Sequence, residues 1–187
     1  MNWSLRLFKG TSRTIMVIFE VIWRRVKRAL LQPIYAIIVW SQCESAVAMP
    51  RVNGPSSVTK NTVLGNNVHI NGLHVRGQGR VSIGDNFHSG KGLLILTQNH
   101  NYATGERLPY DSSHEVKDTT IGDNVWIGLN VTLLPGVTLG EGCIIQAGSV
   151  VCSDIPRLAI AGGHPARVFS ERDKSHYDRL KFEERFF

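Results

Sequence analysis

The sequence predicts an all-β fold, a parallel β-helix of six-residue repeats, with a helical segment at each end. The main evidence is a file of aliphatic residues at intervals of six: Ile121, Ile127, Leu133, Leu139, Ile145 and Val151. A second file stands four residues after each of these: Val125, Val131, Val137, Cys143, Ser149 and Ile155. This interval fits neither the 3.6-residue period of a helix nor the alternation of a half-buried strand. It is typical of a coil of three short strands and three turns, which completes one layer about every 18 residues.

Earlier residues continue the repeat as far as residue 64, with one long interruption. Ile83 and Ile95 are in phase with Ser89 between them, and Leu64 and Ile70 form an earlier pair. Residues suited to tight corners recur between the hexads: Gly65-Asn66-Asn67, Gly84-Asp85-Asn86, Gly122-Asp123-Asn124 and Pro135-Gly136. Residues 101–118 are polar and out of phase, which predicts a loop that protrudes from one corner of the coil.

The remaining segments are predicted to be helical and to cover the open ends of the coil. We expect a single domain: an N-terminal helical extension at 1–57, the β-helix at 58–168 and a C-terminal helix at 169–187. In the C-terminal segment, Ser170 is the expected N-cap, followed by acidic residues in the first turn. In the N-terminal segment, residues 14–40 have a helical pattern that we expect to break at Pro33.

Positive charge is concentrated in the N-terminal extension. The chain carries +6, yet residues 1–60 hold nine Lys or Arg and only two Glu, a net +7, so the rest carries −1. The basic residues 24–28 separate two apolar runs, Ile15–Trp23 and Ala29–Trp40, and neither run reaches the ~20 residues that a spanning helix needs. This pattern suits the surface of an anionic membrane. The alternative is that residues 14–40 cap the first coil and pack on neighbouring subunits.

Other compartments and partners are disfavoured by the same residues. The apolar setting of the basic cluster argues against nucleic acid. Glu20 interrupts the apolar core of any signal peptide, and no small-residue cleavage site follows it. Three cysteines, Cys43, Cys143 and Cys152, offer no paired framework and no metal-type spacing, which fits a reducing cytosol without a structural metal. We therefore expect a cytoplasmic protein at the inner face of the membrane.

Among seven histidines, His100 has the most informative position. It ends the last regular hexad before the protruding loop, within Gln98-Asn99-His100-Asn101-Tyr102. A histidine at a rigid strand end beside a flexible loop can keep its geometry while the loop closes over a substrate. Imidazole is also suited to general-base chemistry near neutral pH.

The ordered motifs of the C-terminal half resemble the left-handed β-helix hexapeptide-repeat acetyltransferases, above all the galactoside and maltose acetyltransferases and the polysaccharide O-acetyltransferases near them. These motifs are the hexad run, NVWIG at 124–128, Pro135-Gly136, QAGS at 146–149 and GGHPARV at 162–168. The resemblance implies a homotrimer with acetyl-CoA bound in clefts between subunits. It also implies that His100 removes the proton of an acceptor hydroxyl as that oxygen attacks the thioester.

The donor contacts that the resemblance implies are Trp126 near the reacting end, Leu129 and Ala147 along the pantetheine arm, and Arg167 at the phosphates. Cys152 and Ser153 stand where the family often has threonine and lysine, and Ser170 where it often has another basic residue. We expect Arg172 to reach the same phosphate as Arg167 from the next helical turn. These departures suggest weaker cofactor binding, not a different cofactor.

The acceptor is less defined by the sequence. Asn99 and Tyr102 flank His100 and can bind sugar hydroxyls, and a membrane-facing terminus suggests a lipid-linked glycan, hence a surface-polysaccharide O-acetyltransferase. Serine or xenobiotic acceptors stay open within the same class. Two other functions are weighed: a zinc carbonic anhydrase of this fold, with His69 and His74 as ligands but no third one, and a non-catalytic trimeric scaffold.

Overall fold

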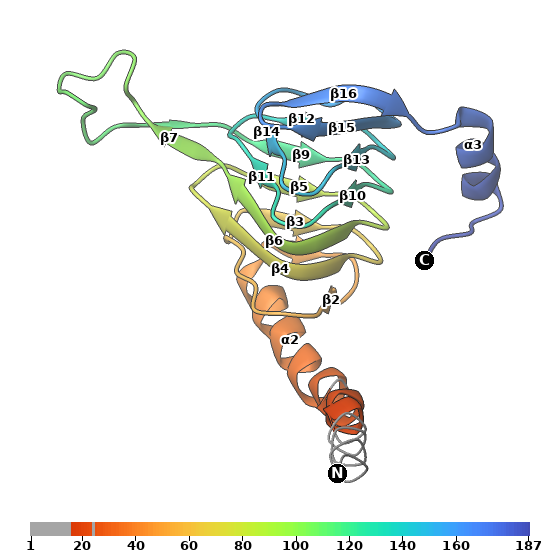
Figure 1. Cartoon of the computed structure of the whole chain (residues 1–187). Coiled ribbons are helices and arrows are strands. Elements are labelled where there is room, and N and C mark those ends of the chain that lie inside the picture. The colour runs from red at the N-terminus through yellow and green to blue at the C-terminus, as the bar shows by residue number, and fades with distance from the viewer. Residues whose placement is uncertain (1–15, 24) are drawn as a thin grey trace, which may run out of the picture.

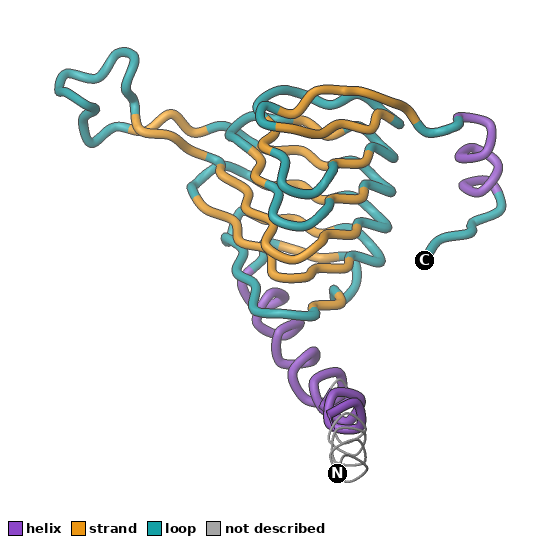
Figure 2. Tube along the Cα trace, in the orientation of Figure 1, coloured by secondary structure: helices purple, strands orange, loops and turns teal. Residues whose placement is uncertain are grey.

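The repeat region winds into a triangular prism of short parallel strands (Figures 1 and 2). The computed structural model describes residues 16–23 and 25–187. Equivalent residues of successive layers pair 18 positions apart, as Trp126 does with Ile144 and Thr132 with Val150. The predicted layer length is confirmed, and so is the fold class, a left-handed parallel β-helix.

The strands lie on three faces of the prism. The first face consists of β1 (Ser45–Ala46), β3 (Thr62–Leu64), β5 (Val81–Ile83), β9 (Thr119–Ile121) and β12 (Thr138–Leu139). The second face consists of β2 (Arg51–Val52), the first halves of β4 (His69–Arg76) and β6 (His88–Leu96), β10 (Trp126–Ile127), β13 (Ile144–Ile145) and β15 (Ala159–Gly163). The third face consists of the second halves of β4 and β6, β11 (Thr132–Leu133) and β14 (Val150–Val151).

Strands β4 and β6 bend from the second face onto the third without ending. Gly72 and Gly92 lie at this bend with φ of 77° and 78°. An L-residue with a side chain rarely adopts such angles, so glycine is the residue that lets the two long strands turn here. As a result, the strands of the second and third faces belong to one hydrogen-bonded sheet.

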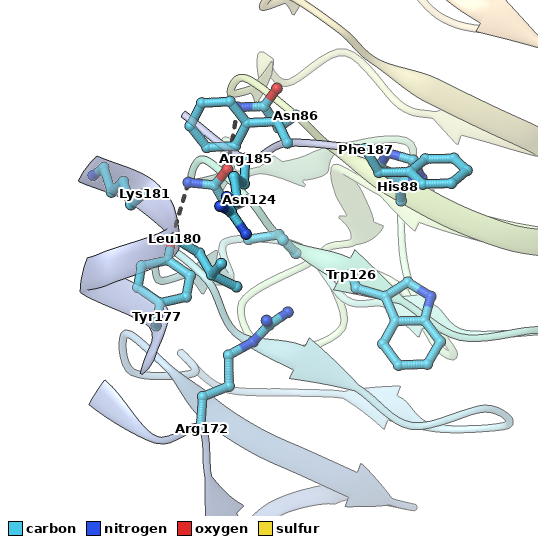
Figure 3. Close-up of a pocket in the computed structure, with 12 residues that line it drawn as sticks. Asn86, His88, Asn124, Trp126, Arg172, Tyr177, Leu180, Lys181, Arg185 and Phe187 are labelled. Atoms are coloured by element: carbon cyan, nitrogen blue, oxygen red, sulfur yellow. Dashed lines mark hydrogen bonds between the residues drawn. The ribbon is translucent and has the colours of Figure 1, made fainter. Parts of the chain in front are cut away.

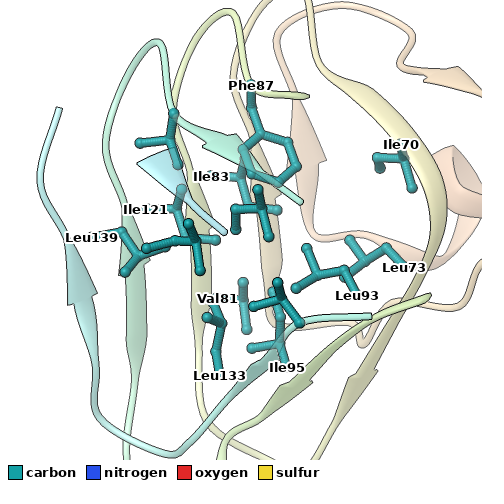
Figure 4. Close-up of a cluster of buried hydrophobic side chains, with 14 of the residues drawn as sticks. Ile70, Leu73, Val81, Ile83, Phe87, Leu93, Ile95, Ile121, Leu133 and Leu139 are labelled. Atoms are coloured by element: carbon teal, nitrogen blue, oxygen red, sulfur yellow. The ribbon is translucent and has the colours of Figure 1, made fainter. Parts of the chain in front are cut away.

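Both predicted aliphatic files point into the prism and contribute to its core. Figure 4 shows Ile121, Leu133 and Leu139 of the first file in this core. All twelve residues of the two files are buried. The polar member of the files, Ser149, is fully buried, and its hydroxyl donates to the Gln146 carbonyl at 2.6 Å and accepts from the Gly163 N–H at 3.2 Å. Burial raises the pKa of the Cys143 thiol to about 12, which fits its predicted place in the core.

The corner between the first and second faces is built on asparagine. Asn67, Asn86 and Asn124 have positive φ of 52°, 53° and 58°, a conformation that asparagine tolerates better than most residues. Their amides form a ladder along the prism, with Nδ2 of Asn67 donating to Oδ1 of Asn86 at 2.9 Å and Nδ2 of Asn86 to Oδ1 of Asn124 at 3.1 Å. The corner residues predicted from turn chemistry therefore also link the layers.

Helix α3 (Lys174–Phe182) is attached to the end of this ladder through Tyr177. The hydroxyl of Tyr177 accepts from Asn124 Nδ2 and donates to a Glu141 carboxylate oxygen, both at 2.9 Å. Its ring packs against Gly142, where an added Cβ would lie 2.7 Å from the ring. Lys181 and Arg157 also approach Glu141, at 2.5 and 3.5 Å. Burial alone would raise the pKa of Glu141, but these hydrogen bonds and charges lower it overall.

The C-terminal helix begins later than predicted. Strand β16 (Ala166–Glu171) runs antiparallel to β15 through Ser170, and Asp173 is the N-cap, with its side chain accepting from the His176 N–H at 2.6 Å. Ser170 is therefore not the cap, because its segment pairs with the last layer instead of starting a helix. This covers the upper edge of the β-helix with a strand.

The helical extension also ends earlier than predicted. It includes a π-helical turn η1 (Lys27–Leu31) and α2 (Gln32–Gln42), and β1 and β2 already form a layer before residue 58. Pro33 does not break the helix, because it lies in the first turn of α2, where no N–H is needed. Only Ala36 and Val39 of α2 are buried, and the helix projects from the lower end of the prism (Figure 1).

Candidate active site

The predicted loop is an antiparallel hairpin that projects from the corner between the third and first faces (Figure 1). Strand β7 (Gln98–His100) pairs with β8 (His114–Val116), so that His100 lies opposite His114. The chain leaves the prism and returns at one layer, because the Lys117 N–H donates to the Thr97 carbonyl at 2.9 Å. The end of the hairpin next to the prism is therefore fixed, whereas its tip is exposed.

His100 is oriented by ring stacking. Its ring lies 3.8 Å from that of Tyr110, nearly parallel at 12°, and 4.8 Å from the tilted ring of His114. In the described part of the chain no hydrogen bond reaches either His100 ring nitrogen, so these ring contacts are what orients the imidazole. His100 is exposed, so a second molecule can approach it.

The hairpin tip is ordered by its own polar contacts. Asn101 Nδ2 donates to Ser113 Oγ at 3.1 Å, and Asn101 Oδ1 accepts from the Thr104 N–H at 3.0 Å. Asp111 accepts from the N–H groups of Ser113 and Glu106, and its pKa is lowered chiefly by the Ser113 hydroxyl. Of the predicted acceptor residues, Asn99 pairs with Glu115 across the hairpin and Tyr102 is 72% exposed.

The predicted donor residues Leu129, Ala147 and Arg167 lie along a different corner, between the second and third faces. The Gly148 N–H donates to the Leu129 carbonyl at 2.7 Å, which stacks the turn of Ala147 on that of Leu129. Arg167 pairs with Gly162 where β15 reaches this corner. Leu129, Ala147 and Arg167 are exposed, and the space beside Gly148 is open, since a Cβ there would meet no atom within 4 Å.

Cys152 and Ser153 are not brought to that corner. They follow β14 at the far end of the third face, on the corner from which the hairpin projects, and both are exposed. The third face therefore separates them from Leu129 and Ala147.

Trp126 lies on the second face, above two stacked histidines. His69, His88 and Trp126 occupy equivalent positions in three successive layers, and the rings of His69 and His88 are 4.1 Å apart. Burial, then the charges of His88 and Arg51, lower the pKa of His69 from 6.5 to about 4, and burial with Arg51 lowers that of His88. Trp126 is 53% exposed, so one side of its ring is available to a ligand.

The zinc ligands considered from the sequence are not brought together. His69 lies on the second face beside His88, whereas His74 lies beyond the Gly72 bend, with Nδ1 2.9 Å from the Ser57 hydroxyl. The four residues between them contain a corner, so their spacing does not place the two rings on one face.

Arg172 occupies a place that the sequence analysis did not predict. Strand β16 crosses the second face, with Arg167 paired to Gly162 at one corner and Glu171 paired to Ala159 at the other. Five residues of extended chain separate Arg167 from Arg172 by roughly 16 Å. The expectation that both reach one phosphate from successive helical turns is wrong, because the segment is a strand.

Two residues that contact His100 were not predicted from the sequence. Tyr110 and His114 follow no period, and only the antiparallel return of the loop brings their rings to His100. A polar loop bounded by strand-like ends is the one sequence signal that would have suggested such a hairpin.

Comparison with known proteins agrees with the observed fold. Residues 118–153 match the family described as bacterial transferase hexapeptide (six repeats). The galactoside O-acetyltransferase of Escherichia coli K12 is 36% identical over 125 residues, which are 65% of this chain and 61% of that enzyme. The chain resembles the hexapeptide-repeat acetyltransferases in sequence and in fold. It spans about 60% of the length of the first curated relatives that it matches.

Two solved structures of acetyltransferases are similar to this chain in fold as well as in sequence. A galactoside acetyltransferase in complex with coenzyme A has a TM-score of 0.54 and 29% identity, over 77% of this chain and 65% of that one. A maltose O-acetyltransferase from Clostridium difficile 630 has a TM-score of 0.54 and 29% identity, over 70% and 66%. The resemblance to this family that the motifs predicted is confirmed.

Proposed function

We propose that the chain is an acetyl-CoA-dependent O-acetyltransferase whose acceptor is a saccharide. The proposal is supported by an exposed His100 that is stacked on Tyr110, and by an open corner beside Gly148 on the same prism. The fold is similar to that of a galactoside acetyltransferase solved in complex with coenzyme A. The pantetheine arm carries amides, and the exposed turns of Leu129 and Ala147 offer main-chain groups to them. Arg167 at the end of this corner supplies a guanidinium for the phosphates.

The reaction is a direct transfer. His100 takes the proton of the acceptor hydroxyl as that oxygen attacks the thioester carbonyl. Collapse of the tetrahedral intermediate breaks the carbon–sulfur bond, and the imidazolium returns its proton to the leaving thiolate. The product is an acetyl ester and free CoA. Holding the two substrates together supplies much of the acceleration without an acyl-enzyme.

A second copy of the chain completes this site. In one chain β7, which carries His100, and β10, which carries Trp126, lie on different sides of the prism (Figure 1). A homotrimer with hairpins crossing between prisms would bring His100 of one copy to the donor corner of the next. A cyclic trimer repeats this heterologous contact three times and closes it.

The acceptor is proposed to be part of a bacterial surface glycan carried on lipid at the inner face of the membrane. Large apolar side chains are exposed along the N-terminal helices, including Phe19, Trp23, Leu30 and Trp40. Such a surface beside a basic cluster favours anionic lipid. Among the described residues no helix is both long and apolar enough to cross a bilayer.

Thiol release from acetyl-CoA, followed with and without a panel of saccharide acceptors, tests the proposed function. We expect acceptor-dependent release, and we expect His100→Ala to reduce it by about 10²- to 10⁴-fold, the usual contribution of a general base. A matched control is His176→Ala, which changes an exposed histidine on α3, away from the hairpin and the donor corner. Equal turnover in the His100 variant would refute the assigned base, and turnover with serine or a xenobiotic but no saccharide would refute the acceptor class.

A further inference from the structure

A cavity lies between α3 and the second face of the prism (Figure 3). Its volume is about 470 Å³, within the range of small-ligand sites. Trp126, His88 and Phe187 line it on the side of the prism, where the Phe187 ring lies 5.2 Å from that of His88 (Figure 3). Its lining also includes Arg172, Lys181 and Arg185. Of the residues for which the sequence predicted a catalytic or donor role, Trp126 and Arg172 line it, whereas His100, Leu129, Ala147 and Arg167 do not.

The cavity has an excess of positive charge. The described residues that line it include three cationic side chains and no Asp or Glu. Two of the cations are already paired outside the lining, since Lys181 binds Glu141 at 2.5 Å and Arg185 binds Glu183 at 2.9 Å. An anion entering the cavity would meet the third cation, Arg172, without a competing carboxylate.

Arg172 is the cation that lacks a partner. It has no ion pair among the described residues, and its Nε is buried without a hydrogen-bond acceptor. The guanidinium lies 5.7 Å from the centre of the Tyr177 ring, and in Figure 3 it extends between Tyr177 and Trp126. A buried donor without an acceptor is costly, so this arrangement is explained by a ligand that supplies the acceptor.

The position of Arg172 separates its anion from the donor phosphates. Arg167, at the donor corner, and Arg172 stand at opposite ends of β16, roughly 16 Å apart. Between them the exposed ring of Trp126 offers a flat apolar surface of the kind on which a sugar ring packs. We propose that this cavity binds the acceptor through an anionic group, a carboxylate or a phosphate on the saccharide, held by Arg172 beside Trp126.

This inference rests on the proposed function and narrows its substrate class to acidic saccharides. The first test is direct binding, measured by calorimetry with galactose 1-phosphate, glucuronate and neutral galactose. We expect the two anionic sugars to bind the wild-type protein and to lose about 10- to 100-fold in affinity in Arg172→Gln, as expected for the loss of charge-assisted hydrogen bonds. Equal binding of galactose, or unchanged anion binding in the variant, would overturn the proposal.

Kinetics separate the acceptor anion from the donor phosphates. Arg172→Gln should raise KM for anionic acceptors and leave KM for acetyl-CoA unchanged, while Arg167→Gln should do the reverse. If Arg172→Gln instead raises KM for acetyl-CoA, and less so for acetyl-dephospho-CoA, the guanidinium holds the donor and the proposal fails. Arg172→Lys, which keeps the charge, reports whether a loss comes from misfolding.

A control on the same helix is Arg179→Gln, which removes an exposed cation paired with Glu183 outside the cavity. It should leave both KM values unchanged. Binding of anionic sugars by a wild-type protein that transfers no acetyl would refute the proposed function and leave the site standing. Acetyl transfer to neutral sugars alone would support the proposed function and refute the anion site.

Discussion

Tyr110 shows how a single side chain can set the geometry of a general base. Its ring is stacked on His100 at 3.8 Å, and no hydrogen bond of the described residues fixes the imidazole in its place. Stacked aromatic pairs contribute about 0.5–1.5 kcal/mol beyond burial, which is enough to select one ring orientation. Tyr110 is therefore assigned as a positioning residue for the proposed transfer.

Replacement of Tyr110 should reduce kcat and spare donor binding. We expect Tyr110→Ala to lower kcat by about 3- to 10-fold, the rate equivalent of the lost stacking energy, with KM for acetyl-CoA unchanged. Tyr110→Phe should restore the rate, because stacking needs the ring and not the hydroxyl. Steady-state kinetics of both variants check this, and a Phe variant as slow as the Ala variant would contradict it.

His69 makes the stability of the prism sensitive to mild acid. The folded chain keeps this imidazole neutral down to a pKa of about 4, whereas its usual pKa is 6.5. Between these values the unfolded chain binds the proton and the folded one does not, so stability falls as pH decreases from about 6.5 to about 4. His88, whose pKa is also lowered, adds to the same trend.

Thermal unfolding at pH 7.5 and 5.0 measures this effect. We expect the wild-type Tm to fall over this interval, and the fall to be smaller in His69→Gln. His164→Gln, at an exposed turn, should retain the full decrease. An identical pH dependence in His69→Gln and wild type would show that other groups govern it.

At the level of residues, the sequence predicted those positions that recur in every layer of the coil. The inward files from Ile121 to Ile155 could be read because every layer places the same positions toward the axis. His100 was found because it ends a regular hexad. Neither the role of Tyr110 nor the location of Arg172 could be predicted in this way. Tyr110 lies in a loop without period, and the location of Arg172 depends on the path of β16 after the last layer.

The N-terminal helices expose large apolar side chains along their described length. Phe19, Trp23 and Leu30 are 68%, 53% and 61% exposed, and the adjoining residues 24–28 carry four basic side chains in the sequence. Apolar insertion combined with charge attraction gives binding that depends on anionic lipid and weakens with salt.

Vesicle flotation tests this expectation for the full chain. We expect binding to vesicles that contain anionic phosphatidylglycerol, weaker binding at high salt, and little binding to phosphatidylcholine alone. The double change Phe19→Ser and Trp23→Ser should abolish flotation, while Leu108→Ser, at a 96% exposed position of the hairpin, should not. Retention of the double variant on vesicles would mean that these helices do not form the contact.

The boundaries of the elements were harder to predict than their existence. The helical pattern at 14–40 and the C-terminal helix are both present in the described residues, but β1, β2 and β16 were missed. Each of these is a terminal strand whose backbone is satisfied by one neighbouring layer, so its sequence need not carry the hexad signal. Local patterns suggested helix at Ser170, and pairing with β15 prevailed.

On the scale of the whole molecule, the proposed site needs two chains, and mixed assemblies can reveal this. His100→Ala and Trp126→Ala should each be nearly inactive alone. Co-expressed in equal amounts, they should recover activity, because about a quarter of randomly formed interfaces then join an intact His100 to an intact Trp126. Activity of the co-purified mixture measures this recovery. A mixture no more active than either variant would place both residues in one subunit's site.

The closed base of the hairpin has a consequence for how relatives of this chain diversify. The Thr97 carbonyl and the Lys117 N–H join across the insertion, and Ile83 still pairs with Ile121 in the layer that follows. The β-helix therefore keeps its winding whatever the number of residues in the inserted hairpin. Selection can lengthen, shorten or rewrite that arm to suit a new alcohol while the supporting framework is inherited unaltered.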